Sequence, residues 1–189
     1  MCKFDIEYMQ FLNEKRQEMK EKYNRVLPSG ELLFNRFEKA AYLGFGANSS
    51  IYDTSIVMGD IKVGNNVWIG PYTILEGLND ELIIGDFVSI DAGVSIYTHD
   101  STRYYLSGGK ETFDHGKVEI KNNSVIGTMS MIKHGVTIGH HCVIGAHSFV
   151  TKDVPDYCIA AGTPAKIIGK VISDDEGIRY EYFRKSNDK

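Results

Sequence analysis

The segment from residue 96 to residue 120, IYTHDSTRYYLSGGKETFDHGKVEI, gathers several side chains that can do chemistry. Two pairs of histidine and aspartate stand near its ends, with an arginine and two tyrosines between them: His99–Asp100, Arg103, Tyr104, Tyr105 and Asp114–His115. Imidazole transfers protons at neutral pH because its unperturbed pKa is about 6.5. Arginine binds phosphate groups, and tyrosine rings stack on other rings. The segment therefore has the residue types for proton transfer and for holding a ring or a phosphate.

On both sides of this segment an aliphatic residue returns at every sixth position. After the segment these anchors are Ile120, Ile126, Ile132, Ile138, Ile144 and Val150. Before it the same register runs through Ile51, Val57, Val63, Ile69 and Leu75 and, after a slip of three residues, through Ile84, Ile90 and Ile96. The residue after the anchor is often glycine, and the fifth position of the hexad is usually small or β-branched. A repeat this regular determines the fold and has to be interpreted first.

A period of six residues excludes the two commonest interpretations of an aliphatic pattern. An amphipathic helix needs apolar residues at i, i+3, i+4 and i+7, and a hairpin sheet needs alternation broken by turns. Coils of three short, flat strands with a turn at each corner do satisfy the period. Each coil then pairs with the next at a spacing of about 4.8 Å, and glycine permits the unusual dihedral angles at the corners. The sequence predicts a mainly β fold, a parallel β-helix of about five coils.

Charge and cysteine content restrict the class of protein. The 189 residues include 21 basic and 25 acidic side chains, for a net charge of −4, and show no basic face of the kind that nucleic-acid-binding proteins carry. The cysteines Cys2, Cys142 and Cys158 form no C-x-x-C pair, so we expect neither a disulfide framework nor a zinc site. The charged stretch 1–20 argues against a signal peptide, and no stretch has the ~18 uninterrupted apolar residues of a membrane span. We expect a cytoplasmic protein without a membrane span.

The repeat divides the chain into three parts. Residues 1–47 lack it and are expected to form a helical cap or arm, with an amphipathic helix over 4–26 and a shorter helix in ELLFNRFEKAAYL. This part would cover the open end of the first coil or pack between subunits; the alternative is a lid or a substrate-binding element. Residues 48–172 are expected to form the β-helix, with a protruding loop at 97–117, and residues 173–189 a C-terminal tail.

The hexads, the loop that begins THD and the ending VIGAHSFVTKDVPDYCIAAGTPAKIIGK together resemble the left-handed β-helix acyltransferases. Within this hexapeptide-repeat family the chain is similar to the sugar O- and N-acetyltransferases, which include galactoside and maltose acetyltransferases and the nucleotide-aminosugar N-acetyltransferases of surface-polysaccharide biosynthesis. The resemblance covers about residues 48–172. It implies a left-handed coil, acetyl-CoA (an acyl-CoA) as cosubstrate and a homotrimer with active sites between subunits. The left-handed sense comes from the resemblance alone, since parallel crossovers are generally right-handed.

The resemblance also implies roles for residues of the loop and its neighbourhood. His99, at the root of the loop, would be the catalytic base that takes the acceptor's proton as it attacks the thioester. Asp100 or Asp91 would orient the imidazole or bind an amine of the acceptor, although both are equally compatible with solvated corner residues. The acceptor would contact three residues of the loop, which can instead pack between subunits: Arg103, Tyr104 and Tyr105.

Donor-binding residues follow from the same motifs. Thr128 and Ala146 match positions whose backbone contacts the pantetheine arm. Thr151 and Lys152 match residues that hold the nucleotide end, where a lysine is favourable beside phosphates, and Lys166 is a further candidate. Without the family motif, Ala146 and Thr151 would be interpreted as plain coil residues.

Several functions are compatible with this sequence. We expect transfer to the amino group of a nucleotide-linked sugar, because IYTHDS…LSGG resembles the polysaccharide-cluster members and because this chain has VIG at 125–127 where the O-acetyltransferases usually have WIG. The alternatives are O-acetylation of a sugar, with His99 as an essential base, and a non-catalytic β-helix that serves in assembly. We expect no metal site, although γ-class carbonic anhydrases share the fold, because His134 and His140 should point to different faces.

Overall fold

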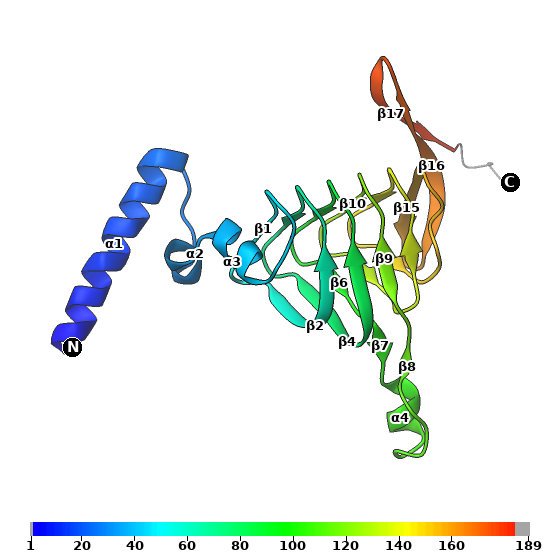
Figure 1. Cartoon of the computed structure of the whole chain (residues 1–189), viewed down its shortest axis with the longest axis horizontal. Helices are drawn as coiled ribbons and strands as arrows, with labels where there is room; N and C mark the ends of the chain where they lie inside the picture. Colours follow the sequence, from blue (N-terminus) through cyan, green and yellow to red (C-terminus); the bar gives the residue numbers. More distant parts are fainter. Residues whose placement is uncertain (1, 184–189) are drawn as a thin grey trace, which may run out of the picture.

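The computed structural model describes residues 2–183, which form a stack of parallel coils with three flat faces (Figure 1). The first face contains β1 (Ser50–Ile51), β3 (Trp68–Ile69), β5 (Ser89–Ile90), β10 (Val125–Ile126), β13 (Val143–Ile144) and β15 (Cys158–Gly162), in that order. The second face contains the first halves of β2 (Ile56–Val63) and β4 (Ile74–Ile84), then β6 (Ser95–Ile96), β11 (Met131–Ile132) and β14 (Phe149–Val150). The third face contains the second halves of β2 and β4, then β9 (Val118–Ile120) and β12 (Thr137–Ile138), with Val154 bridged to Ile138. The expected mainly β, parallel β-helix is confirmed, with six rungs on the first face and five on each of the others.

The hexad anchors form the axis of the stack. Twelve of the largest side chains that the structure buries completely are all aliphatic and nearly all anchors: Ile51, Ile69, Leu75, Leu82, Ile84, Ile90, Ile96, Ile120, Ile126, Ile132, Ile138 and Ile144. The small residues at the fifth hexad position tie successive rungs together. The Ser124 hydroxyl, for example, donates to the Gly139 carbonyl (2.8 Å) in the next rung and accepts from Cys142 N (3.0 Å).

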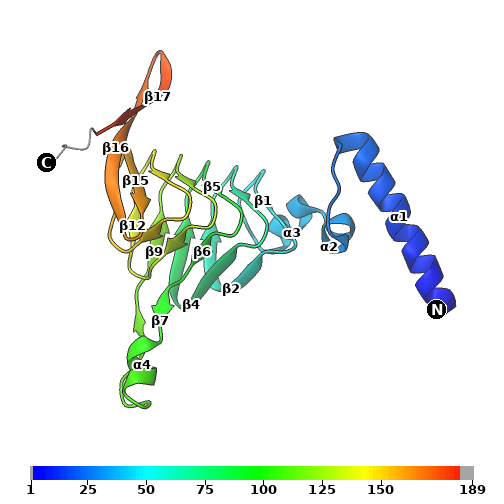
Figure 2. The same cartoon turned by 180° about the vertical axis from the view of Figure 1, so that it is seen from behind.

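The interruptions of the repeat are absorbed without loss of register. The sequence separation between paired residues of β2 and β4 grows from 18 at Gly59–Gly77 to 21 at Ile61–Leu82, so the three extra residues sit inside β4. The larger interruption lies between β6 and β9 and contains β7 (His99–Asp100), α4 (Thr102–Leu106) and β8 (Asp114–His115). Figure 2 shows it projecting from the side of the stack as a single finger.

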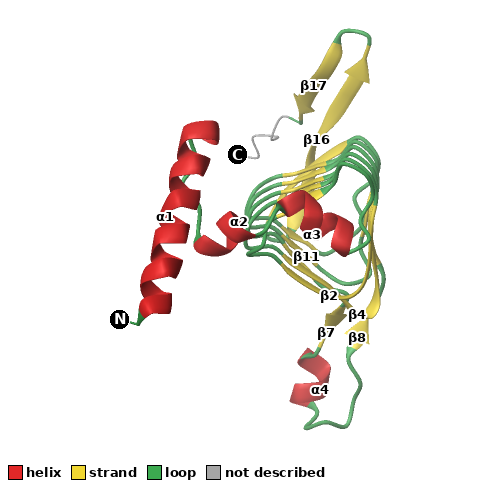
Figure 3. Ribbon diagram, turned by 60° about the vertical axis from the view of Figure 1, so that its left-hand side comes forward, coloured by secondary structure: helices red, strands yellow, loops and turns green. Residues whose placement is uncertain are grey.

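The N-terminal segment contains three helices, and the short helix α3 covers the first coil. It contains α1 (Lys3–Tyr23), α2 (Ser29–Leu33) and α3 (Arg36–Tyr42), so the stretch expected to be one short helix is two. The helix breaks at Asn35, whose side-chain oxygen accepts from Phe37 N (2.9 Å) and caps α3. Figure 3 views the stack close to its axis, with α3 over the open end and α1 standing away from the coils.

At the other end the chain leaves the coil as a hairpin. β15 pairs antiparallel with β16 (Ala165–Asp174), which pairs antiparallel with β17 (Gly177–Tyr182). The expected tail from residue 173 thus contains the end of β16 and all of β17, and residues 184–189 of it lie outside the described residues. Among the helices of residues 2–183, none has the length and apolarity needed to cross a bilayer.

Candidate active site

The finger begins at the corner between the second and third faces. Its root is a two-residue antiparallel ladder in which His99 pairs with His115 and Asp100 with Asp114. Thr98, immediately before the ladder, is completely buried. The rigid backbone of the coil therefore fixes the position of His99. The rest of the finger can make other contacts.

The His99 imidazole is oriented by a carboxylate that belongs to another rung. Its Nδ1 lies 2.9 Å from Glu76 Oε2, and the Glu76 side chain is only 1% exposed. Glu76 also accepts from Leu78 N (2.5 Å) and Thr98 N (2.9 Å). Four backbone and side-chain donors thus converge on one buried carboxylate when the Thr98 hydroxyl is included.

These hydrogen bonds determine the protonation of the pair. Burial by itself would raise the pKa of Glu76, but the hydrogen bonds from Leu78 N, Thr98 N and His99 outweigh burial and hold the pKa below its ordinary value. An ionised carboxylate can only accept, so Nδ1 of His99 must donate. In the neutral ring this leaves the lone pair on Nε2, which is the state that a general base requires.

His99 opens onto a cavity of about 280 Å³ beside the second face. Asp100, Lys133 and His134 also line this cavity. The imidazole stacks on Phe113 of the finger, with ring centroids 5.6 Å apart and planes 16° apart, and Tyr104 meets Phe113 edge-on at 5.2 Å. Both the coil and the finger therefore hold the ring in place.

His134, in the rung that follows the finger, supplies a second imidazole to the same cavity. Its Nε2 is buried and has no hydrogen-bond partner among residues 2–183. Burial, and next the charge of Lys133, lower the pKa of His134. A buried ring nitrogen without a hydrogen-bond partner is uncommon in folded proteins.

The two aspartates expected to support His99 have other partners. The Asp100 carboxylate accepts from Thr102 N (2.8 Å) at the start of α4, and this hydrogen bonding lowers its pKa. The Asp91 carboxylate accepts from the Ser89 hydroxyl (2.9 Å) and follows β5, at the corner between the first and second faces. Within one chain Asp91 is therefore one corner away from His99, whereas Asp100 shares the His99 cavity.

The sequence analysis did not identify Glu76. The residue directly follows the anchor Leu75, as Tyr97 follows Ile96 in the next rung, and the two anchors are paired. A glutamate in this otherwise Gly-rich hexad position was the available signal. Recognising it required the register between rungs, because the three-residue slip lies between Glu76 and His99.

The finger residues expected to bind an acceptor are engaged with one another. Arg103 contacts Glu111 (2.8 Å) and lies 3.6 Å from Asp114. Tyr104 belongs to the aromatic stack on His99, and Tyr105, 73% exposed, meets Tyr104 edge-on. The exposed tip of the finger thus presents Tyr105 and Leu106 away from its own coil.

The residues expected to bind the donor lie in two places. Thr151, Lys152 and Lys166 line one cavity of about 350 Å³ between the last corner and the start of β16, called the donor cleft below. Neither lysine takes part in an ion pair within the described part of the chain. Thr128 and Ala146 are exposed and stack at the corner between the first and second faces, where His147 N donates to the Thr128 carbonyl (2.9 Å).

Within residues 2–183, no group of three or more His, Cys, Asp or Glu side chains is arranged to hold a metal ion.

Comparison with known proteins agrees with this geometry. The family model described as bacterial transferase hexapeptide (six repeats) matches residues 117–152. A galactoside O-acetyltransferase of Escherichia coli (strain K12) is 32% identical over 149 residues, which cover 78% of this chain and 64% of the relative. A chloramphenicol acetyltransferase of Klebsiella aerogenes is 38% identical over 115 residues, 51% of this chain and 55% of the relative. This chain thus spans between about half and two thirds of the length of these curated relatives.

Solved structures share the coil stack. The N-acyltransferase AntD from Bacillus cereus, in complex with dTDP and 3-hydroxybutyryl-CoA, superposes with a TM-score of 0.60 at 24% identity, covering 71% of this chain and 89% of that one. The hexapeptide-repeat acetyltransferase VCA0836 from Vibrio cholerae, complexed with acetyl coenzyme A, gives a TM-score of 0.52 at 24% identity, covering 86% and 88%. Residues 117–152 carry the six-repeat hexapeptide motif of bacterial transferases, and the coil stack has the fold of solved hexapeptide-repeat acyltransferases.

Proposed function

We propose that the protein is an acetyl-CoA-dependent acetyltransferase that acts on a sugar. The observation that carries this proposal is the His99 imidazole, whose Nδ1 is held by the buried Glu76 and whose side chain lines a cavity. The donor cleft supports it with Lys152 and Lys166, neither of which forms an ion pair among the described residues; Asp153 also lines the cleft. The relatives support it too, because they are named as acetyltransferases and two of the similar solved structures hold CoA compounds.

In the proposed reaction, a nucleophile of the acceptor attacks the thioester carbonyl carbon while Nε2 of His99 takes the proton it loses. The carbon–sulfur bond then breaks, and the proton on the imidazole passes to the departing thiolate. One acetyl group moves to the acceptor, and free CoA leaves. Glu76 balances the imidazolium that exists between these two transfers.

We propose the amino group of a nucleotide-linked sugar, destined for a surface polysaccharide, as the acceptor. AntD has been solved with a nucleotide and, in a variant, with dTDP-4-amino-4,6-dideoxyglucose. Asp91, Asp100 and the finger residues Arg103, Tyr104 and Tyr105 are the proposed contacts to this acceptor.

The second candidate function is O-acetylation of a sugar. The buried Glu76 favours it, because a hydroxyl is much harder to deprotonate than an amine and depends more on a base whose ring is oriented and whose positive charge is balanced during the transfer. A non-catalytic role in assembly is the third candidate. Intact His99 and donor-cleft residues count against it.

The proposed assembly is a homotrimer in the cytoplasm with active sites between subunits. Asp91, Thr128 and Ala146 lie one corner away from His99 and the donor cleft of their own chain, so a neighbouring subunit would have to bring the two corners together. Cys2, Cys142 and Cys158 are all unpaired, which suits a reducing compartment.

Donor binding tests the proposal without knowledge of the acceptor. Isothermal titration calorimetry should show acetyl-CoA binding that the Lys152→Gln, Lys166→Gln double variant weakens by at least about tenfold, since a hydrogen bond to a charged group contributes about 1.5–3 kcal/mol. Lys121→Gln, at another corner of the coil, is the matched control. Intact protein that binds no acetyl-CoA would refute the enzyme proposal and favour the assembly role.

A further inference from the structure

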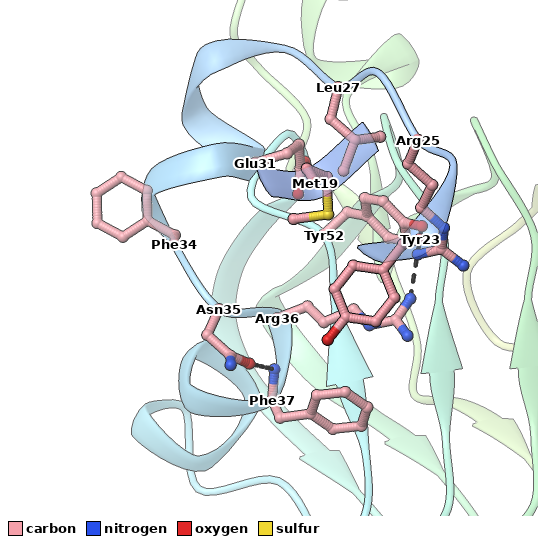
Figure 4. Close-up of a pocket in the computed structure, with 10 residues that line it drawn as sticks. All are labelled: Met19, Tyr23, Arg25, Leu27, Glu31, Phe34, Asn35, Arg36, Phe37 and Tyr52. Atoms are coloured by element: carbon pink, nitrogen blue, oxygen red, sulfur yellow. Dashed lines mark hydrogen bonds between the residues drawn. The ribbon is translucent and has the colours of Figure 1, made fainter. Parts of the chain in front are cut away.

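A third cavity, of about 290 Å³, lies at the N-terminal end of the stack, where no proposed donor or acceptor residue is found. The end of α1, helices α2 and α3, and the first corner of the coil enclose it, and Figure 4 shows side chains from all four converging. We call it the N-terminal pocket. It shares no lining residue with the His99 cavity or the donor cleft.

Two arginines give the N-terminal pocket its charge. Arg25 and Arg36 both line it, and neither forms an ion pair within residues 2–183. The one carboxylate in the lining, Glu31, is 8% exposed, and its Oε1 accepts from both Thr54 N (2.9 Å) and the Thr54 hydroxyl (3.0 Å). Two guanidinium groups beside a single, already hydrogen-bonded carboxylate leave a net positive charge that favours an anion.

Aromatic rings hold one guanidinium in a fixed orientation. Arg36 lies over the Phe37 ring (5.0 Å to the centroid) and over the Tyr52 ring (5.7 Å), and its Nη1 is 3.5 Å from the Tyr52 hydroxyl. A guanidinium whose face is covered by rings keeps its N–H donors along the edge. These donors match the oxygens of a phosphate.

The rest of the wall is apolar and aromatic. Tyr23 lines the pocket and is 55% exposed, so it offers a surface on which a planar ring could stack, whereas the Phe34 ring points away from the other lining side chains (Figure 4). The volume is near the lower end of the 300–1,000 Å³ that is usual for small-molecule sites, large enough for a compound bigger than inorganic phosphate.

We propose that the N-terminal pocket binds a phosphorylated aromatic compound of the nucleotide class, with Arg25 and Arg36 on the phosphate and the Tyr23 ring on the base. This site is independent of the proposed acetyl transfer, because its residues lie at the opposite end of the stack from the donor cleft (Figure 1).

Calorimetry with the full chain tests this site. The protein is titrated with UDP, with uridine or with inorganic phosphate in the absence of CoA, because CoA carries a phosphorylated nucleotide that would also suit the N-terminal pocket; the Arg25 and Arg36 variants assign the binding to this pocket. UDP should bind, and the other two should bind at least about tenfold more weakly, because each offers only half of the interactions. Arg36→Gln and Arg25→Gln should each weaken UDP binding about tenfold or more, whereas Arg179→Gln, on the C-terminal hairpin, should leave it unchanged.

Three results would overturn the proposal: no UDP binding to the wild-type protein, UDP binding that both arginine variants retain undiminished, or equal binding of inorganic phosphate. Circular dichroism and sedimentation accompany each variant. If Arg36→Gln does not fold, Arg25→Gln and Arg36→Lys, which keeps the charge but loses the planar donor edge, provide the same comparison. A change in assembly mass without UDP binding would identify the pocket as a contact between subunits instead.

Discussion

At the scale of single residues, the proposed reaction depends on which ring nitrogen of His99 is free to take a proton. Glu76 is hydrogen-bonded to Nδ1 of His99, and Phe113 stacks on one face of the imidazole ring. The cavity lies beside this ring. Only Nε2 is left to meet a substrate. Glu76 is accordingly a positioning residue, which acts through His99.

Replacing Glu76 by glutamine should separate its role from that of the base. Glu76→Gln removes the charge that fixes the His99 tautomer, so kcat should fall more than about tenfold with little change in KM, but less than the 10²–10⁴ of losing a general base through His99→Ala. The pH profile of kcat should shift as well. Glu81→Gln, on the exposed part of the same strand, is the control. Equal kcat and pH profile in Glu76→Gln and wild type would contradict the assignment.

His134 should make the stability of the protein depend on pH. Its pKa is lowered in the folded state, chiefly by burial. As pH falls below the ordinary value of about 6.5, the unfolded chain binds a proton that the folded chain does not, so stability is lost towards acid pH. His134→Gln should therefore lose less Tm than wild type between pH 7.5 and 5.5, measured by thermal unfolding. Thr137→Ala is a non-titrating control, and identical slopes in His134→Gln and wild type would refute the effect.

A site residue could be predicted from the sequence when the residues it acts with lie close to it along the chain. His99, Asp100 and the finger residues were found because they interrupt a repeat within one short segment. Glu76 was not, because its contact with His99 crosses from one rung to the next and the three extra residues in β4 intervene. Such contacts become predictable only once the register is known.

At the scale of elements, α3 closes the first coil through a single lysine. Lys39 Nζ donates to three carbonyls of the first corner: Tyr52 (3.1 Å), Asp53 (2.9 Å) and Ser55 (3.2 Å). These oxygens sit at the open end of the stack, where no earlier coil is present to partner them. Lys39 thus donates to carbonyls of the first coil as backbone N–H groups of the preceding rung do elsewhere in the stack.

Removing this lysine should destabilise the whole stack. Lys39→Met keeps the length of the side chain but removes the lysine donor from the Asp53 and Ser55 carbonyls and the charge 3.5 Å from the Asp53 carboxylate, which should cost about 1–3 kcal/mol of unfolding free energy. Urea unfolding followed by circular dichroism measures this, and Lys20→Met on the exposed side of α1 is the control. Equal midpoints for Lys39→Met and wild type would show that water serves those carbonyls equally well.

The elements themselves differ in how well a sequence predicts them. The strands of the coil follow directly from the hexad anchors, because each anchor must point to the axis. The two short N-terminal helices and β17 have no period, and their positions depend on tertiary contacts such as the Asn35 cap and the pairing of β16 with β17. Segments without a repeat were accordingly placed with less detail.

At the scale of the whole molecule, the outer surface is uneven. The first and second faces carry exposed apolar side chains, including Ile56 (50%), Val125 (39%) and Met131 (43%). The third face instead carries charged residues, with ion pairs Lys62–Glu81 and Lys117–Glu119. Apolar surface of this kind marks a contact between proteins, and the proposed trimer would cover it.

A charge on the first face should therefore prevent assembly. Val125→Glu places a carboxylate on the apolar surface, and sedimentation equilibrium should show one chain mass in place of three. Thr137→Glu, on the third face, should leave the mass at three chains. A wild-type protein that sediments as a single chain would contradict the proposed trimer directly.

The central claim is that this chain transfers an acetyl group from acetyl-CoA to a sugar. Mass spectrometry of the products, from acetyl-CoA incubated with a panel of nucleotide-linked amino sugars and neutral sugars, tests it most directly and avoids interference from the three protein cysteines. The account predicts an acceptor that gains one acetyl group, on nitrogen and confined to an amino sugar, with the yield reduced in His99→Ala. Acetylation of neutral sugars would establish the O-acetyltransferase alternative. Folded protein that binds acetyl-CoA yet acetylates no sugar in the panel would contradict the claim.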